Sequence, residues 1–583
     1  MRKATGWKKA MASLVSAATL FSCTITGTMN FSTVTAADGA NYAEALAMSL
    51  YFFDANECGT EVDDNCLTWR GNCHTYDAEA SLDSAANLSS SEKAMIKEAN
   101  GGSNTVDVSG GYHDAGDHIK FNVTMGFAAS SLAMSYYMNP GAYEKANCEG
   151  HFREVLKKTC DYLMKTTYLD NSGNVYAVCA TVANSADHET WEPPEKQTYD
   201  RPTYWLTASY NNSVTTATMA SALAGTAYVF KDVDAEYSAK CMKYSKALYD
   251  FAKKYPDMQD TTSGLYRLTD TYIDDLALAE VWFYINGEGS LPTYKPTANG
   301  CYNGQYYDYH LYCWDKVWSG YATLMYYITG DQAFANEMQF ELNNKGGVPT
   351  NKYNAAGWGA SRYNCALQMV ALGLAKGDAN STYALGAKYQ TDYLLGNNQK
   401  STSFLLGYGN TWPQQVHHRA ANSQKTGMTH VLYGALVGGP TDSDCTYTDY
   451  WDQYQSTEPA LDYNACFALA CAGLVNLYGG DASELDDIIK NAPEIDENYK
   501  FDGEEQPQPS TETTETTGDE KLKGDVNNDG VVNVTDVVCL GRYLVKAELT
   551  EDVDTSDFNY DVNDDGKINV FDLVAVRRIL IEQ

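Results

Sequence analysis

The sequence has few basic residues, with 41 lysines and arginines against 76 aspartates and glutamates, and its formal net charge is −35 over 583 residues. So acidic a surface repels phosphate backbones, which argues against nucleic acid as a partner. After the first 36 positions the chain also has no apolar run of about 20 residues, the length that crosses a bilayer. We therefore expect neither nucleic-acid binding nor membrane association.

None of the 15 cysteines belongs to a Cys-x2-Cys pair, and this absence argues against a zinc ribbon. Cys58, Cys66 and Cys73 cluster near the N-terminus, while Cys301 and Cys313 flank a tyrosine-rich loop. In an exported protein these thiols could form disulfides, and otherwise they would remain free and buried. The sequence leaves the pairing open.

Alternating strand patterns are scarce, and helical periodicity dominates between Asn41 and Tyr478. The predicted helices cover residues 43–55, 125–138, 152–165, 214–230, 235–254, 274–285, 316–328, 362–375, 382–395 and 461–478. The loops between them are long and rich in glycine and tyrosine, too long for a simple helical bundle, and such loops usually carry function. The pattern predicts a mostly α domain.

Residues 1–36 have the pattern of a secretory signal peptide, which predicts an extracellular protein. A basic start precedes an apolar run from Ala10 to about Met29, and small residues follow at Ala36 and Ala37. A membrane anchor is the first alternative, but no stop-transfer segment follows. A lipid on Cys23 is the second, but its flanking residues make a poor lipid-attachment site.

The composition changes between residues 503 and 520, where proline, threonine and glutamate replace aromatic and aliphatic residues. Such a segment cannot bury apolar surface, so it is predicted to be a linker. It separates a large domain at residues 37–500 from a small one at residues 521–583.

Two loops in the C-terminal domain, 36 residues apart, follow the pattern of an EF-hand calcium loop. Oxygen-bearing side chains stand at loop positions 1, 3, 5, 9 and 12, glycine stands at position 6, and position 7 offers its carbonyl. The predicted ligands are Asp525, Asn527, Asp529, Val531, Asn533 and Asp536 in the first loop and Asp561, Asn563, Asp565, Lys567, Asn569 and Asp572 in the second. Apolar residues after each loop predict a helix, so we expect a small all-α unit that holds two Ca²⁺ ions.

This duplicated loop and helix, with Asp at position 12 and a Thr/Pro linker before it, resembles a type I dockerin over residues 522–581. The resemblance implies binding to a cohesin module of a scaffoldin, and hence a place in a cellulosome. Loop positions 10 and 11, at which cohesins are distinguished, hold Val534-Thr535 and Val570-Phe571 rather than the frequent Ser-Thr pairs. The cohesin specificity therefore stays open.

Two carboxylates stand three residues apart in a glycine-rich segment at residues 110–118. Glycine allows a tight loop that a ligand can approach closely. Of the pair Asp114 and Asp117, one carboxylate could orient a water while the other takes its proton, although a calcium loop or a capped turn would use the same residues.

Glu458 precedes an apolar helix in a segment rich in tyrosine and tryptophan. A carboxyl group in such surroundings has a raised pKa and can act as a general acid, as in glycosidases. His417 and His418 could instead form a metal pair, but no further His or Cys at ligand spacing supports that reading.

Together these segments resemble glycoside hydrolase family 9, a cellulase family, from Asn41 to about Tyr478. The motifs that carry the resemblance lie at residues 110–121, 187–195, 358–363, 407–419 and 430–440. The family implies an (α/α)6 barrel. It also implies inversion of the anomeric centre, for which the two catalytic carboxyl groups lie roughly 6.5–9.5 Å apart.

By this resemblance Asp117 is the general base, Asp114 helps to hold the attacking water, and Glu458 is the general acid. Asp449 and His417 complete the expected catalytic set. The residues expected to bind sugar are His188, Trp191, Trp358, Arg362, Arg419 and Tyr454.

The chain departs from the family in two places. The stretch that we matched to the family's structural calcium site, residues 212–217, has no carboxylate, so Asp274 is the single candidate ligand and calcium in the catalytic domain is not expected. Trp451 stands where the family often has arginine. The whole pattern predicts a secreted, cellulosomal endo-β-1,4-glucanase. The alternatives are an enzyme that prefers xyloglucan or mixed-linkage glucan, and a non-catalytic carbohydrate-binding component.

Overall fold

The computed structural model describes residues 40–483 except 63–64, 267, 269–270, 298–300, 303–304, 307–311, 346–352 and 354–356. Beyond Ser483 it describes only positions 485, 489, 523–524, 526, 532, 540, 544, 561–562, 568, 575–576 and 579. The predicted signal peptide and linker lie outside these residues. The chain divides into two compact units, Met1–Gly503 and Glu504–Gln583.

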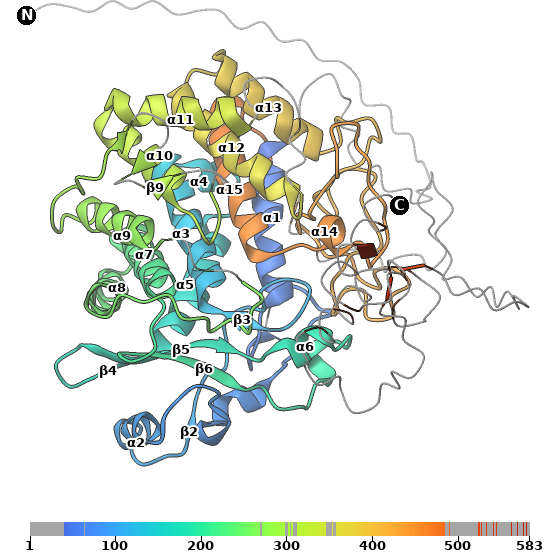
Figure 1. Cartoon of the computed structure of the whole chain (residues 1–583). Coiled ribbons are helices and arrows are strands. Elements are labelled where there is room, and N and C mark those ends of the chain that lie inside the picture. Colours follow the sequence, from blue (N-terminus) through green and yellow to red (C-terminus); the bar gives the residue numbers. More distant parts are fainter. Residues whose placement is uncertain are drawn as a thin grey trace, which may run out of the picture. The chain divides into compact units, whose positions relative to one another are not determined.

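The larger unit is built mainly of helices (Figure 1). The long helices are α1 (Tyr42–Asn56), α2 (Ser90–Ala99), α3 (Asn122–Met138), α5 (Glu149–Lys165), α7 (Ser213–Phe230), α8 (Ala235–Lys254), α9 (Ile273–Ile285), α10 (Trp318–Thr329), α11 (Gln332–Lys345), α12 (Ala360–Ala375), α13 (Thr382–Leu394) and α15 (Leu461–Tyr478). Short helices are α4 (Ala142–Lys145), α6 (Ser185–Glu189) and α14 (Tyr454–Thr457). All ten predicted helices are present, whereas α2 and α11 were not predicted. None of the helices described is long and apolar enough to cross a membrane.

The helices differ in how much of their surface is buried. α3, α7 and α15 are buried on nearly all sides, whereas α5 and α8 bury one face each. α3 packs against both α7 and α15. Small residues let α3 and α7 approach each other closely. A Cβ added to Gly225 of α7 would lie 2.7 Å from the Cβ of Ala133 in α3, so this crossing requires glycine. The apolar, all-round-buried sequences thus form the centre of the unit.

A small antiparallel sheet lies beside the helices and positions two loops. Its central strand β5 (Val175–Val182) pairs with β3 (Lys120–Phe121), β4 (Thr167–Leu169) and β6 (Thr203–Thr207). The glycine-rich segment 110–118 leads into β3, and the connection from β5 to β6 contains α6. Because β3 and β5 are neighbours in the sheet, it brings the paired carboxylates, which precede β3, close to α6, which follows β5. The remaining strand pairs, β1 (Ala80–Ser81) with β2 (Thr105–Val106), and β7 (Pro296–Thr297), β8 (Cys301–Tyr302) and β9 (Gln305–Tyr306), are short.

The smaller unit has a core to which both repeats contribute equivalent residues. Val526, Leu540, Val562 and Val576 are buried together, and the second pair follows the first by 36 positions, the spacing of the two loops. Two apolar side chains from each repeat therefore form one core. Apart from Asp561, the predicted calcium ligands lie outside the described residues.

Candidate active site

The loop that carries the paired carboxylates is pressed against the rest of the site at two glycines. Gly111 has φ +74°, and a Cβ there would lie 2.7 Å from the ring of Tyr162. A Cβ on Gly116 would lie 1.9 Å from the carbonyl oxygen of His417. The backbone amide of Gly116 donates to Glu458 Oε1 at 3.3 Å, so the loop touches the predicted general acid directly. Only glycine permits this contact.

Asp114 and Asp117 are both buried, and their environments separate their pKa values. Burial and the neighbouring charge of Asp117 raise the pKa of Asp114 well above its usual range, and Tyr266 donates a hydrogen bond to Asp114 Oδ2. Burial would raise the pKa of Asp117 too, but the hydrogen bond from His188, Nδ1 to Oδ2 at 2.6 Å, and the His188 charge outweigh it and lower that pKa. Asp117 thus stays ionised where Asp114 holds a proton.

Each of these two aspartates keeps one buried oxygen, Oδ1 in both cases, without a hydrogen-bond partner among the residues that the structure describes. A buried carboxylate oxygen without a partner is costly, so each of these oxygens is available to accept a hydrogen bond from a ligand or a water molecule. The arrangement suits a water molecule that one carboxyl group holds and the other deprotonates.

Glu458 has the properties of a general acid. It is 8% exposed, and burial together with the charge of Asp117 raises its pKa to about 7. Its place is fixed by the Gly116 amide and by its own backbone carbonyl, which accepts from Gly438 at 3.0 Å. At neutral pH it is therefore protonated in a large fraction of molecules, beside an ionised Asp117.

Asp449 and His417 belong to one loop system. The Asp449 carboxylate accepts from the backbone amides of Gln414 at 2.6 Å and Gln415 at 2.9 Å, and burial raises its pKa to about 6. His417 donates from Nδ1 to the carbonyl of Trp451 at 2.7 Å, and burial lowers its pKa to about 4. Asp449 thus holds the loop on which a neutral His417 reaches the site.

Arg419 joins α6 to the same loop. Its Nε donates to the carbonyl of Thr190 at 3.0 Å, and its Nη2 donates to that of His188. The guanidinium lies 4.9 Å from the ring centroid of Trp191, whose indole packs edge-on against Trp451 at 4.9 Å. These side chains form an aromatic and cationic wall next to the carboxylates.

Three further predicted sugar-binding residues differ in exposure. Trp358 is 50% exposed and Tyr454 is 39% exposed, and their rings lie 5.0 Å apart, available for stacking on a sugar. Arg362 is buried instead, pairs with Asp462 and donates to the Tyr363 hydroxyl at 2.7 Å. Two nitrogens of its guanidinium, Nη1 and Nη2, already bond to protein groups, and its contact with sugar stays a prediction.

The structure also assembles a set of metal-ligating side chains that the sequence analysis missed. Cys58, Cys73, His74 and His113 are buried, and their ligand atoms all lie within 4.8 Å of one another. Two thiols and two imidazoles are a typical zinc set. His74 Nε2 bonds to Gln197 Oε1 at 2.7 Å, which leaves Nδ1 facing the cluster, as in zinc sites with an oriented histidine.

The two thiols of this Cys/His cluster differ in their electrostatic surroundings. Burial raises the pKa of Cys58, whereas the hydrogen bond from Cys58 and the Arg70 charge, against burial, lower the pKa of Cys73 to about 7. The four residues of the cluster come from three separate segments of the chain, so a search for Cys-x2-Cys spacing could not reveal them. The adjacent Cys73-His74 and the position of His113 beside Asp114 were the available signals.

A second candidate cation site lies at the start of α9. Asp274 and Asp275 are buried, and burial raises the pKa of both. Asp274 Oδ2 accepts from the Val317 amide at 2.9 Å and Asp275 Oδ1 from the Thr218 hydroxyl at 2.7 Å, but one oxygen of each lacks a partner. The sequence analysis weighed Asp274 alone and did not consider its neighbour. Asn212, where calcium was considered, caps α7 by accepting from the Thr215 amide.

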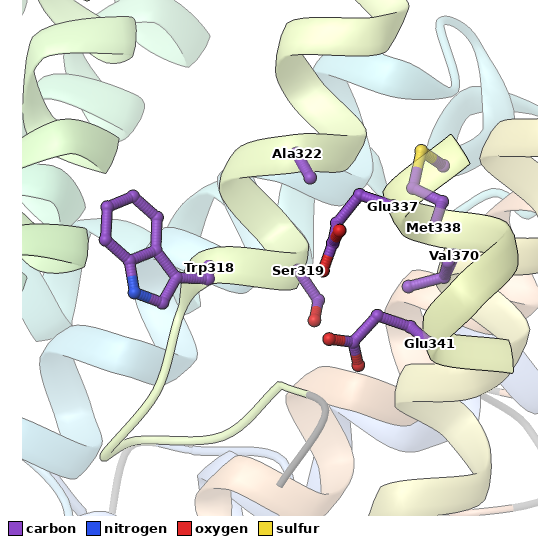
Figure 2. Close-up of a pocket in the computed structure, with 7 residues that line it drawn as sticks. All are labelled: Trp318, Ser319, Ala322, Glu337, Met338, Glu341 and Val370. Carbon is purple, nitrogen blue, oxygen red and sulfur yellow. The ribbon is translucent and has the colours of Figure 1, made fainter. Parts of the chain in front are cut away.

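A narrow pocket lies among α10, α11 and α12 (Figure 2). Its lining residues are Trp318, Ser319, Ala322, Glu337, Met338, Glu341 and Val370, which include none of the predicted catalytic residues. Burial raises the pKa of Glu337 to about 7, so this carboxyl group is protonated in much of the population at neutral pH.

Comparison with known proteins identifies both units. Residues 42–471 match Glycosyl hydrolase family 9, and residues 523–581 match the Dockerin type I domain. The first match covers more than half of the chain, so the protein belongs to glycosyl hydrolase family 9 and carries a C-terminal type I dockerin. The fold of the larger unit is accordingly the (α/α)6 barrel of this family, as the sequence predicted.

Relatives from bacteria and from animals share the larger unit. Endoglucanase B of Cellulomonas fimi is 32% identical over 480 residues, which are 76% of this chain and 43% of that protein. The catalytic domain of Clostridium thermocellum CelT is 34% identical, with a TM-score of 0.66 over 76% of this chain and 97% of that one. An endoglucanase of the termite Nasutitermes takasagoensis is 27% identical, with a TM-score of 0.62 over 75% and 99% of the two chains. The chain thus spans less than half of the Cellulomonas enzyme and nearly all of the two solved structures.

Proposed function

We propose that the protein is a secreted, cellulosomal endo-β-1,4-glucanase that hydrolyses cellulose with inversion of the anomeric centre. The observation that carries the proposal is the divergence of two buried carboxyl groups. The pKa of Asp117 is lowered while that of Glu458 is raised to about 7, and the amide of Gly116 links the two. A protonated and an ionised carboxyl group are what a glycosidase requires, and inversion is inferred from membership of glycosyl hydrolase family 9.

In the proposed reaction Asp117 takes a proton from a water molecule that Asp114 also holds. The unpartnered oxygens of the two aspartates are the contacts available to this water. The water attacks the anomeric carbon as the glycosidic bond breaks, and Glu458 gives its proton to the leaving oxygen. His188 stabilises the charge of Asp117 before the attack.

The aromatic residues supply the binding surface for the glucan. Trp358 and Tyr454 offer exposed rings, and Trp191 and Trp451 line the site beside Arg419. Aromatic rings stack on the C–H faces of sugars and so favour a polysaccharide substrate. The paired acid and base argue against a purely binding component, which would need neither.

The dockerin would attach the enzyme to a scaffoldin. Type I dockerins bind calcium, and the predicted ligands in two loops would hold two ions. Cohesin binding follows from the domain type, and residues 1–36 supply the proposed export signal.

The test compares Asp117→Asn with Asp107→Asn, which changes a half-exposed carboxylate on the preceding segment that pairs with Lys165. Loss of a general base costs about 10²–10⁴-fold in rate, so Asp117→Asn should lose at least this much cellulose hydrolysis while Asp107→Asn does not. NMR of early products should show the α-anomer. Initial β-anomer, or a fully active Asp117→Asn, would overturn the mechanism. Product profiles on mixed-linkage glucan and xyloglucan would separate the alternative substrates.

A further inference from the structure

Four charged side chains lie almost fully buried next to the glycine-rich segment 110–118, which carries Asp114 and Asp117 and is called the catalytic loop below. Lys120 pairs with Asp77 at 2.8 Å, and Arg201 pairs with Asp77 at 3.2 Å and with Asp187 at 2.5 Å. The exposed fraction of each of these side chains is 2% or less. Burying four charges is costly even when each has an oppositely charged partner, so the arrangement calls for a reason beyond stability.

Arg201 connects the catalytic loop to α6. Its Nη1 contacts Asp187, the third residue of α6, and its Nη2 donates to the carbonyl of His118 in the loop at 2.9 Å. The His118 amide in turn donates to Asp187 Oδ1 at 3.2 Å. Arg201 and Asp187 therefore tie the loop and the helix together through three contacts that involve the backbone of one residue, His118.

The residue after Asp187 touches the proposed base. His188 donates from Nδ1 to Asp117 Oδ2 at 2.6 Å, and His118 follows Asp117 directly. Arg201 thus connects Asp187 and His118, which are next in sequence to His188 and Asp117, the two partners in this hydrogen bond. Any shift of α6 against the loop changes the distance between the imidazole and the carboxylate.

We propose that Arg201 is a positioning residue for the catalytic base, acting through Asp187 and the His118 carbonyl to hold His188 against Asp117. The inference rests on the proposed role of Asp117. Arg419 holds the other side of α6 through the carbonyls of His188 and Thr190. The helix is therefore clamped by one arginine from the sheet side and by another from the active-site loop.

The position of His188 should be visible in the pH dependence of the reaction. The groups that face Asp117 are His188 from α6, Arg419 and His417 from the opposite loop, Asp114 from its own loop, Asp187 behind it and Glu458 before α15. Of these, the His188 hydrogen bond contributes most to keeping Asp117 ionised, because it is the largest influence that lowers its pKa. If the bond lengthens, Asp117 is protonated at higher pH and the acidic limb of kcat/KM moves upward.

The experiment compares Arg201→Met, Arg201→Lys and a matched control, Arg70→Met. Arg70 is similarly buried and paired, with Nε 2.7 Å from Glu195 Oε1, and its Nη2 lies 3.6 Å from Cys73 Sγ, so the zinc content of both variants is measured as well. Among the described residues, none of its hydrogen bonds or ion pairs reaches α6 or segment 114–118. A displacement of about 1 Å in a catalytic group can cost about 10²-fold, so Arg201→Met should lower kcat by this order with little change in KM. The acidic limb of the kcat/KM profile of Arg201→Met should move to higher pH. Arg201→Lys keeps the charge without the planar fork and should restore part of both effects.

The outcomes separate this inference from the reaction mechanism. If Arg201→Met loses thermal stability to the extent that Arg70→Met does but keeps the wild-type acidic limb and kcat, Arg201 is merely structural and the inference is wrong. Asp117→Asn, measured alongside, tests the base itself, since full activity in that variant would overturn the mechanism instead. Should Arg201→Met fail to fold, the same acidic limb is measured in Asp187→Asn, which removes the ion pair with little change in shape.

Discussion

Replacing Glu458 with glutamine should stabilise the folded protein at alkaline pH while it removes the proposed acid. Burial and the charge of Asp117 raise the pKa of Glu458 from 4.5 to about 7 in the folded state. Between these two pH values the folded chain binds a proton that the unfolded chain has lost. The free energy of unfolding therefore falls as the pH rises through this window. Glutamine does not ionise, and its carbonyl can still accept from the Gly116 amide.

The size of the effect follows from the two pKa values. A rise from 4.5 to about 7 corresponds to about 3 kcal/mol, because each pH unit is worth about 1.4 kcal/mol. Unfolding entropy of about 2 cal/mol/K per residue over the 430 residues from 42 to 471 gives about 0.9 kcal/mol/K. The Tm of Glu458→Gln minus that of the wild type should therefore be about 3 °C larger at pH 9 than at pH 5.

Calorimetry of both full-length proteins at pH 5 and pH 9, with calcium present, measures this difference for the larger unit. The same variant should lose hydrolysis of cellulose by about 10²–10⁴-fold, because it cannot protonate the leaving oxygen. Aryl glycosides with good leaving groups need little protonation and should lose much less rate.

Two results would refute this reasoning. A Tm difference between variant and wild type that is the same at both pH values would mean that Glu458 has no raised pKa. Equal rate losses on cellulose and on activated aryl glycosides would mean that Glu458 is structural rather than the acid.

The remaining predictions concern metal ions. Elemental analysis of the purified protein should find about one zinc per chain, and Cys73→Ser should lose both the zinc and thermal stability. A metal-free wild type of full stability would contradict the Cys/His assignment. Removal of calcium with a chelator should abolish cohesin pull-down, because the small dockerin core needs the binding energy of its ions to fold, while cellulose hydrolysis persists. Pull-down that survives chelation would refute the calcium dependence. Hydrolysis that is lost with it and returns on addition of calcium, but not of zinc, would assign a calcium ion to Asp274 and Asp275.

The sequence by itself determined most of the long helices and the motifs. Apolar periodicity predicts α8 to the residue, because a helix that buries one face repeats its apolar residues with its own period, and a long apolar segment predicts α15 to the residue. It missed α11, whose Glu337 and Glu341 are buried and interrupt the apolar face. The duplicated calcium loops were equally visible, since all their ligands lie within a dozen residues.

Only the tertiary structure decided which distant side chains meet. Cys58 and His113 are 55 positions apart, and Arg201 reaches Asp77 across 124. The partner of Asp117 is likewise 71 positions away, at His188. The local pattern around each residue is compatible with many partners, because the burial and charge that set a pKa come from other segments. The helices could therefore be predicted from the chain, whereas the protonation states on which the proposed chemistry rests follow from how the loops are packed.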